Sequence, residues 1–144
     1  MLTNLRTFRI EWGDCDPANI VYFPRYLAYF DNCTSALFEA VGFPKPLLLK
    51  QFNIVGFPLV DVRATFLIPS TFGDEVTVRS CVSEWGRSSF KVKHQLMKGE
   101  SLAVEGWETR VWTGRDASRP GGIGSRPIPR ELIARFDDPN PVPL

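Results

Sequence analysis

The segment that most constrains the fold is residues 24–41, where apolar side chains recur at helical spacing. The apolar positions are Tyr26, Leu27, Phe30, Cys33, Leu37 and Val41. Pro24 suits the first helical position, because its missing N–H costs nothing there. Gly42 suits a C-terminal cap, and Pro44 and Pro46 prevent continuation of the helix. The pattern predicts one helix of about five turns, long enough to form the core of a small domain.

Most of the remaining chain alternates apolar and polar side chains, which is typical of half-buried strands. The predicted strands cover residues 6–12 before the helix and 58–68, 75–82, 89–97 and 102–113 after it. In the last strand, Leu102 and Val104 share one parity, whereas the later apolar residues Trp107 and Val111 have the other. Gly106 lies at this change, which predicts a β-bulge there.

The spacing of these strands predicts the architecture. Successive strands with short connections imply antiparallel pairing, and the long helix is the predicted element able to cover one face of the sheet. The sequence therefore predicts a single α+β domain over residues 1–144, with one long helix held in a curved five-stranded antiparallel sheet. Residues 114–127 are predicted to form a mobile loop, 128–136 a short closing helix, and the proline-rich tail from 137 a frayed end.

Charge and cysteine content narrow the function classes. The formal net charge of +1 gives no global electrostatic case for nucleic acid or an anionic membrane. No apolar run has the length of a membrane span or of a signal-peptide core. The cysteines are odd in number and form no CxxC pair, which disfavours a zinc or redox site and fits a reducing compartment. We expect a cytoplasmic protein that uses no metal and no other cofactor.

The segment GDCDPANIVYFPRY, residues 13–26, places Asp14 and Asp16 just before the predicted helix. An ordinary turn is one interpretation, because Asp-Pro is common turn chemistry. A catalytic carboxylate beside an apolar pocket is the other, since free N–H groups at a helix start stabilise developing negative charge. Asp14 is predicted to orient the turn by bonding to its own backbone.

Together with FGDEVTV (72–78), WGRSSFKVKHQ (85–95) and the order of elements, this segment resembles the hot-dog-fold acyl-CoA thioesterases, in particular the 4-hydroxybenzoyl-CoA thioesterase type. The resemblance extends from about residue 6 to about residue 136. It implies a hot-dog fold and a homodimer or a dimer of dimers with active sites at the subunit interface. It also implies an acyl-CoA substrate.

The resemblance assigns roles to particular residues. It implies that Asp16 is the catalytic carboxylate and that the backbone N–H of Phe23 binds the thioester carbonyl. A carboxylate either attacks the thioester carbon, forming a mixed anhydride, or activates water as a base, and both roles stay open. CoA is implied near the turn of Arg87, Ser88 and Ser89, which suit phosphate by charge and hydroxyl donors. A plain polar hairpin turn is the alternative there.

Candidate residues for binding the acyl group lie on the long helix or just before it. Asp31 lies at the edge of its apolar face and is either a solvated flank or an acceptor for a phenolic hydroxyl, the role that the resemblance implies because the 4-hydroxybenzoyl-CoA thioesterase type has an aspartate at the matching position. Tyr22 and Tyr26 are candidates to line an aryl site, although aromatic residues at helical spacing are more often core. His94 shares a face with apolar residues and is predicted to be a hydrogen-bonded core or interface residue, which argues against a Ser-His or Cys-His triad.

The predicted function is therefore hydrolysis of an aromatic acyl-CoA, such as 4-hydroxybenzoyl-CoA, to the free acid and CoA. Two alternatives stay open. The first is a thioesterase for short aliphatic acyl-CoA, and the second is a non-catalytic acyl-CoA-binding module.

Overall fold

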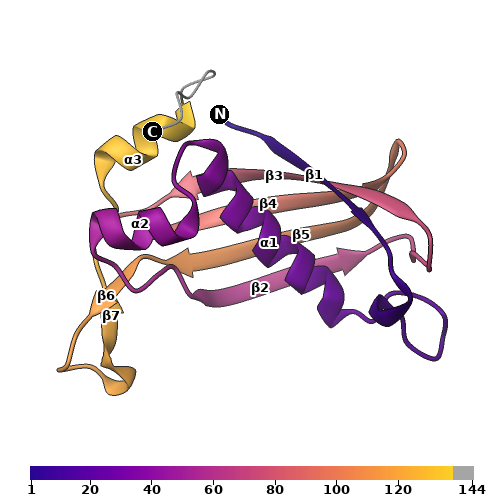
Figure 1. Ribbon diagram of the computed structural model, residues 1–144, viewed down its shortest axis with the longest axis horizontal. Helices are drawn as coiled ribbons and strands as arrows, with labels where there is room; N and C mark the ends of the chain where they lie inside the picture. Colours follow the sequence, from indigo (N-terminus) through magenta and orange to yellow (C-terminus); the bar gives the residue numbers. More distant parts are fainter. Residues whose placement is uncertain (138–144) are drawn as a thin grey trace.

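The computed structural model describes residues 1–137, and the tail predicted to fray lies almost entirely outside them. Five antiparallel strands form one twisted sheet in the order β1-β3-β4-β5-β2, and α1 crosses one face of it diagonally (Figure 1). The strands of this sheet are β1 Asn4–Arg9, β2 Leu59–Phe66, β3 Glu75–Trp85, β4 Ser89–Lys98 and β5 Ser101–Val111. The helices are α1 Pro24–Ala40, α2 Lys45–Phe52 and α3 Arg130–Asp137. The predicted α+β architecture is confirmed, with α2 as an addition.

The long helix α1 forms where the apolar period predicts it. Pro24 occupies its first turn. Gly42 follows the helix with a left-handed φ of 93°, and its N–H donates to the Glu39 carbonyl at 3.0 Å. Glycine suits this position because it adopts the left-handed conformation without steric cost. The side chains that α1 buries are Tyr26, Phe30, Cys33, Thr34, Ala36, Leu37 and Phe38.

The prolines that end α1 also begin α2, which the sequence pattern did not predict. Pro44 immediately precedes α2 and Pro46 is its second residue. Neither position needs an N–H for the helical ladder, so proline is favourable there. The same residues therefore act as a stop for one helix and a start for the next.

Two boundaries differ from the sequence prediction. β1 ends at Arg9, and Trp12, expected inside that strand, lies in an exposed 3-10 turn. Residues 114–127, expected to be a loop, contribute to a two-stranded sheet of β6 (Thr113–Arg115) and β7 (Ile123–Ser125). This small sheet projects beyond the end of β5 (Figure 1).

The predicted bulge at Gly106 in β5 is wrong. Gly106 pairs regularly with β4, and the register shift lies at Ala103, which is buried together with Val104. After this shift the buried residues of β5 include Glu108 and Arg110, which were expected on the opposite face. The strand therefore turns two charged side chains toward α1 and leaves its later apolar residues half-exposed.

Gly106 permits a close contact between helix and sheet. The ring of Phe30 lies directly over it, and a Cβ at position 106 would overlap that ring. On the neighbouring strand, His94 stacks on the same ring with centroids 4.7 Å apart and planes at 6°. The glycine is thus explained by a close approach of α1 to β5.

The core is divided into two clusters along α1. The N-terminal half of the helix packs on the first cluster, which includes Val21, Val76 and Leu96. The C-terminal half packs on the second, which includes Phe90 and Trp112 and is covered by α2 and α3. This division separates the loop before α1 from the β3–β4 turn, because each belongs to a different end of the core.

Candidate active site

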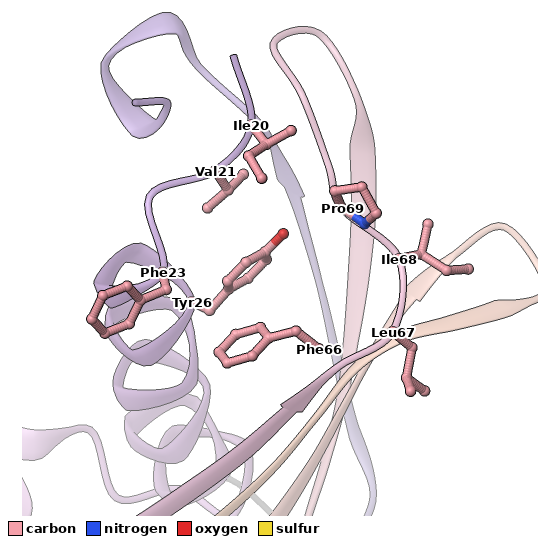
Figure 2. A pocket seen from close by; sticks show the side chains of 8 residues that line it. All are labelled: Ile20, Val21, Phe23, Tyr26, Phe66, Leu67, Ile68 and Pro69. Atoms are coloured by element: carbon pink, nitrogen blue, oxygen red, sulfur yellow. The ribbon is translucent and has the colours of Figure 1, made fainter. Parts of the chain in front are cut away.

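A cavity of about 200 Å³ lies between the start of α1 and the end of β2 (Figure 2). Its lining residues are Ile20, Val21, Phe23, Tyr26, Phe66, Leu67, Ile68 and Pro69. The rings of Tyr26 and Phe66 lie 5.6 Å apart between centroids, with their planes tilted at 44°, and the Tyr26 hydroxyl points toward the gap between Ile20 and Pro69 (Figure 2). An apolar cavity that contains one polar side-chain group, here the Tyr26 hydroxyl, is typical of small-molecule sites.

Asp16 lies on the loop that borders this cavity. Its N–H donates to the carbonyl of Ile20 at 3.0 Å, and its Oδ1 accepts the N–H of Ala18 at 2.8 Å. A backbone bridge between Cys15 and Val21 closes the same loop. Asp16 therefore does stabilise a turn, and it uses one carboxylate oxygen to do so. No donor among residues 1–137 bonds the other oxygen, Oδ2.

The backbone N–H of Phe23 is available to a ligand. Within residues 1–137 it donates no hydrogen bond, whereas the preceding N–H of Tyr22 donates to the Asp14 carbonyl at 2.8 Å. Phe23 directly precedes α1, and Pro24 has no N–H to offer. The partial positive charge of the helix start therefore faces outward at Phe23, where it can stabilise an oxygen that gains negative charge.

Asp14 orients the loop, as predicted from the sequence. Its Oδ2 accepts the N–H of Glu11 at 2.9 Å, and its Oδ1 lies 3.7 Å from Nε of Arg25. Burial and then the neighbouring Asp14 carboxylate raise the pKa of Tyr29 far above its ordinary value. Asp14 is therefore engaged by the loop and the helix beside it, while Asp16 keeps one oxygen free.

The predicted aryl-site tyrosines differ in position. Tyr26 is 4% exposed and lines the cavity. Tyr22 is half-exposed, packs on the ring of Phe23 at 5.6 Å and lies outside the lining.

The predicted CoA-binding turn lies at the other end of the sheet. Arg87 is exposed, and its carbonyl accepts the N–H of Ile128 at 2.8 Å. The carbonyl of Ser88 accepts the N–H of Trp112 at 2.7 Å. With 17 residues, α1 is about 25 Å long, and it separates this turn from the cavity. One chain alone therefore does not bring Arg87, Ser88 and Ser89 to Asp16.

Asp31 lies in the middle of α1, and its side chain is 59% exposed. Its Oδ1 accepts a hydrogen bond from Nη2 of Arg110 at 2.8 Å. Arg110 also donates to both oxygens of Glu108, from Nε at 2.9 Å and from Nη2 at 3.0 Å. The sequence pattern did not indicate Glu108 and Arg110. Their face of the strand was assigned from the positions of apolar residues, and this rule puts charged side chains on the solvent-exposed face.

Glu108 connects to further buried polar groups. Its Oε2 accepts the hydroxyl of Thr34 at 2.6 Å and lies 3.4 Å from Nε2 of His94, whose Nδ1 is 2.7 Å from Oγ of Ser80. Burial opposes ionisation of Glu108, but interactions with His94 and Arg110 prevail and lower its pKa to about 2. His94 is therefore a hydrogen-bonded core residue, as predicted.

Among residues 1–137, no three His, Cys, Asp or Glu side chains gather in a way that would hold a metal ion. None of the helices in that range combines the length and the hydropathy of a membrane span.

The long helix packed on a five-stranded antiparallel sheet defines the hot-dog class of folds. The chain belongs to the Thioesterase-like superfamily, which it matches over residues 10–136. It is thus an enzyme of the thioesterase class, as predicted.

Individual relatives are consistent with this family. The chain is 35% identical over 117 residues to 4-hydroxybenzoyl-CoA thioesterase of Pseudomonas sp. (strain CBS-3), covering 77% of this chain and 83% of that one. It is 26% identical over 142 residues to 1,4-dihydroxy-2-naphthoyl-CoA hydrolase of Synechococcus sp. (strain WH7803), covering 92% of each. The solved structure of an Asp-to-Asn variant of 4-hydroxybenzoyl-CoA thioesterase complexed with 4-hydroxybenzoyl-CoA superposes with a TM-score of 0.85 at 28% identity, covering 93% of this chain and 98% of that one.

Proposed function

We propose that the protein hydrolyses an aromatic acyl-CoA thioester of the 4-hydroxybenzoyl-CoA kind, with Asp16 as the reacting carboxylate. The observation that carries this proposal is the free N–H of Phe23 at an apolar cavity, in the same short connection as the unbonded oxygen of Asp16. The names of the relatives support the substrate class, because they describe enzymes acting on 4-hydroxybenzoyl-CoA and 1,4-dihydroxy-2-naphthoyl-CoA.

The chemistry follows from these two groups. The thioester carbonyl accepts the N–H of Phe23, and the helix start stabilises the charge that grows on its oxygen during addition. If Asp16 attacks, a mixed anhydride forms, CoA leaves as a thiolate, and water then hydrolyses the anhydride. If Asp16 is a base, it takes a proton from the water that adds to the carbon, and the tetrahedral intermediate then breaks its C–S bond and releases CoA as a thiolate that takes up a proton. Both routes consume one water and yield the free acid and CoA.

We propose that a second copy of the chain completes the site. β2 is an edge strand in which every residue except Ala64 is exposed, including Val60 and Phe66. An apolar edge strand of this kind favours pairing with another chain. Two-fold antiparallel pairing of β2 strands would place the start of one beside the end of the other. Since Arg110 pairs with Leu59 at the start of β2, the Asp31–Arg110 pair of one copy would approach the cavity of the other.

The assembly is tested by adding a charge at this edge. Wild-type protein is expected to scatter light as a dimer or tetramer at micromolar concentration. Val60→Asp is expected to shift it toward monomer and to lower turnover, because an unpaired buried carboxylate is costly. Leu5→Asp is the matched control, since Leu5 is equally exposed on the opposite edge strand β1. A fully active wild-type monomer would rule out a site at the interface.

The substrate assignment is tested by comparing two aryl thioesters. Asp31 has one oxygen held by Arg110 and receives no bond at the other from residues 1–137, so it is free to accept a ring hydroxyl. We expect a higher kcat/KM for 4-hydroxybenzoyl-CoA than for benzoyl-CoA, and Asp31→Ala should shrink this ratio about fivefold or more.

The control for this comparison is Asn32→Ala, at the next exposed position of α1, which should keep the ratio. Equal losses for both substrates in Asp31→Ala would make Asp31 a structural helix residue. A kcat/KM for butyryl-CoA above both aryl values would favour the short-chain aliphatic alternative.

The turn of Arg87, Ser88 and Ser89 is proposed to bind the CoA phosphates of a site formed with another copy. Arg87→Ala is then expected to raise KM about tenfold for a CoA thioester and far less for an N-acetylcysteamine thioester, which lacks the nucleotide. Lys91→Ala is the control, because Lys91 lies near the turn but pairs with Glu84 at 3.1 Å. Equal effects of Arg87→Ala on both thioesters would leave Arg87 as part of a hairpin turn only.

A further inference from the structure

Arg110 connects the exposed Asp31 to the polar interior of the protein. Its side chain is 5% exposed. Besides Asp31 and Glu108, it donates from Nη1 to the carbonyl of Phe57 at 3.3 Å. A guanidinium bonded on three sides, with a bidentate carboxylate on one of them, has little rotational freedom.

Glu108 is itself fixed from two elements. The hydroxyl of Thr34, on α1, donates to it, and His94, on β4, lies against the same oxygen. Ser80 on β3 holds the far side of the His94 ring. The orientation of Arg110 is therefore set by a chain of contacts that extends across the sheet and up to the helix.

We propose that Arg110 is a positioning residue that sets selectivity for a ring hydroxyl, by holding the Asp31 carboxylate in one orientation with one oxygen open. The inference rests on the role proposed above for Asp31. An exposed aspartate on a helix otherwise samples several rotamers, and an acceptor fixed in advance discriminates better because it loses less entropy on binding. Arg110 acts through Asp31, with most of its own donors already occupied.

The test is Arg110→Lys, which keeps the charge but replaces the planar fork by a flexible ammonium group. The measurement is kcat/KM for 4-hydroxybenzoyl-CoA and benzoyl-CoA in wild type, Arg110→Lys, Asp31→Ala and the double variant. Arg110→Lys is expected to lower the ratio of the two values about fivefold or more. In the Asp31→Ala background, Arg110→Lys is expected to leave the ratio at the value of the single variant Asp31→Ala.

Two results would overturn the inference. One is an unchanged ratio in Arg110→Lys, and the other is a further fall of the ratio in the double variant, which would show that Arg110 acts without Asp31. If Arg110→Lys does not fold, Glu108→Gln combined with Arg110→Gln removes both buried charges together, and the same change in ratio is expected.

The outcome also separates this inference from the proposed function. If wild type shows no preference for the hydroxylated ring, or if Asp31→Ala keeps that preference, the role of Asp31 is wrong and the inference falls with it. If the preference depends on Asp31 but not on Arg110, the proposed function stands and only the inference is wrong.

Discussion

Asp16→Asn is expected to lower turnover of 4-hydroxybenzoyl-CoA by at least about 10³-fold while leaving substrate binding largely intact. The amide oxygen can still accept the N–H of Ala18, which Asp16 binds at 2.8 Å, so the loop keeps its shape. What is lost is a carboxylate that attacks the thioester or takes a proton from water. The measurements are single-turnover release of CoA thiol and equilibrium titration of the variant with the thioester.

Asp14→Asn is the matched control for this experiment. Asp14 lies two residues away, but its carboxylate bonds the N–H of Glu11 at 2.9 Å, and an amide oxygen can replace it there. Its effect on turnover should be far smaller than that of Asp16→Asn. Near wild-type turnover in Asp16→Asn would contradict the proposed mechanism, whichever of its two routes operates.

Glu108→Gln is expected to destabilise the fold by about 3 kcal/mol or more at neutral pH. The change leaves the buried guanidinium of Arg110 without the carboxylate that bonds it at 2.9 and 3.0 Å. The measurement is the free energy of unfolding from urea denaturation. Glu105→Gln on the same strand is the control, because Glu105 faces the other side and pairs with Lys93 at 3.2 Å. A loss of less than about 1 kcal/mol in Glu108→Gln would contradict a buried ion pair.

The same residue predicts a dependence of stability on pH. The pKa of Glu108 falls from an ordinary 4.5 to about 2 in the folded protein. A lowered carboxyl pKa contributes stability that is fully present above the unfolded value and is lost as pH falls through the folded value. Wild type should therefore lose stability between about pH 4.5 and 2 through Glu108, and Glu108→Gln should lack this component. A constant difference between the two proteins over that range would contradict the assignment.

The architecture was predictable where local patterns and tertiary packing agree. The apolar stripe of α1 has its proline start and its glycine end within the same segment, so no distant contact is needed to define it. β5 shows the opposite case. Glu108 and Arg110 are buried because Thr34, His94 and Asp31 reach them from other elements, and a parity rule based on hydropathy cannot include such partners.

The candidate site was predictable on one side only. Asp16 and Phe23 lie in one short connection and Tyr26 in the first turn of α1, so their proximity follows from the sequence. The second wall of the cavity, with Phe66 and Pro69 among its residues, comes from β2 and the segment that follows it. Its place opposite the helix start depends on how the whole sheet pairs. The turn at Arg87 had to be located by the fold, because motif order carries no information about which end of a sheet a hairpin occupies.

The close contact at Gly106 has a consequence for how such an enzyme changes its substrate over evolutionary time. The ring of Phe30 packs against the backbone of β5 at Gly106, which has no side chain, and Asp31 is the next residue of the helix. The separation of α1 and β5 at this point therefore sets the span of the Asp31–Arg110 bond. A methyl group added at position 106 would push the helix outward and change that span. If Asp31 selects the ring, acyl preference can drift through a core substitution that no substrate atom ever touches.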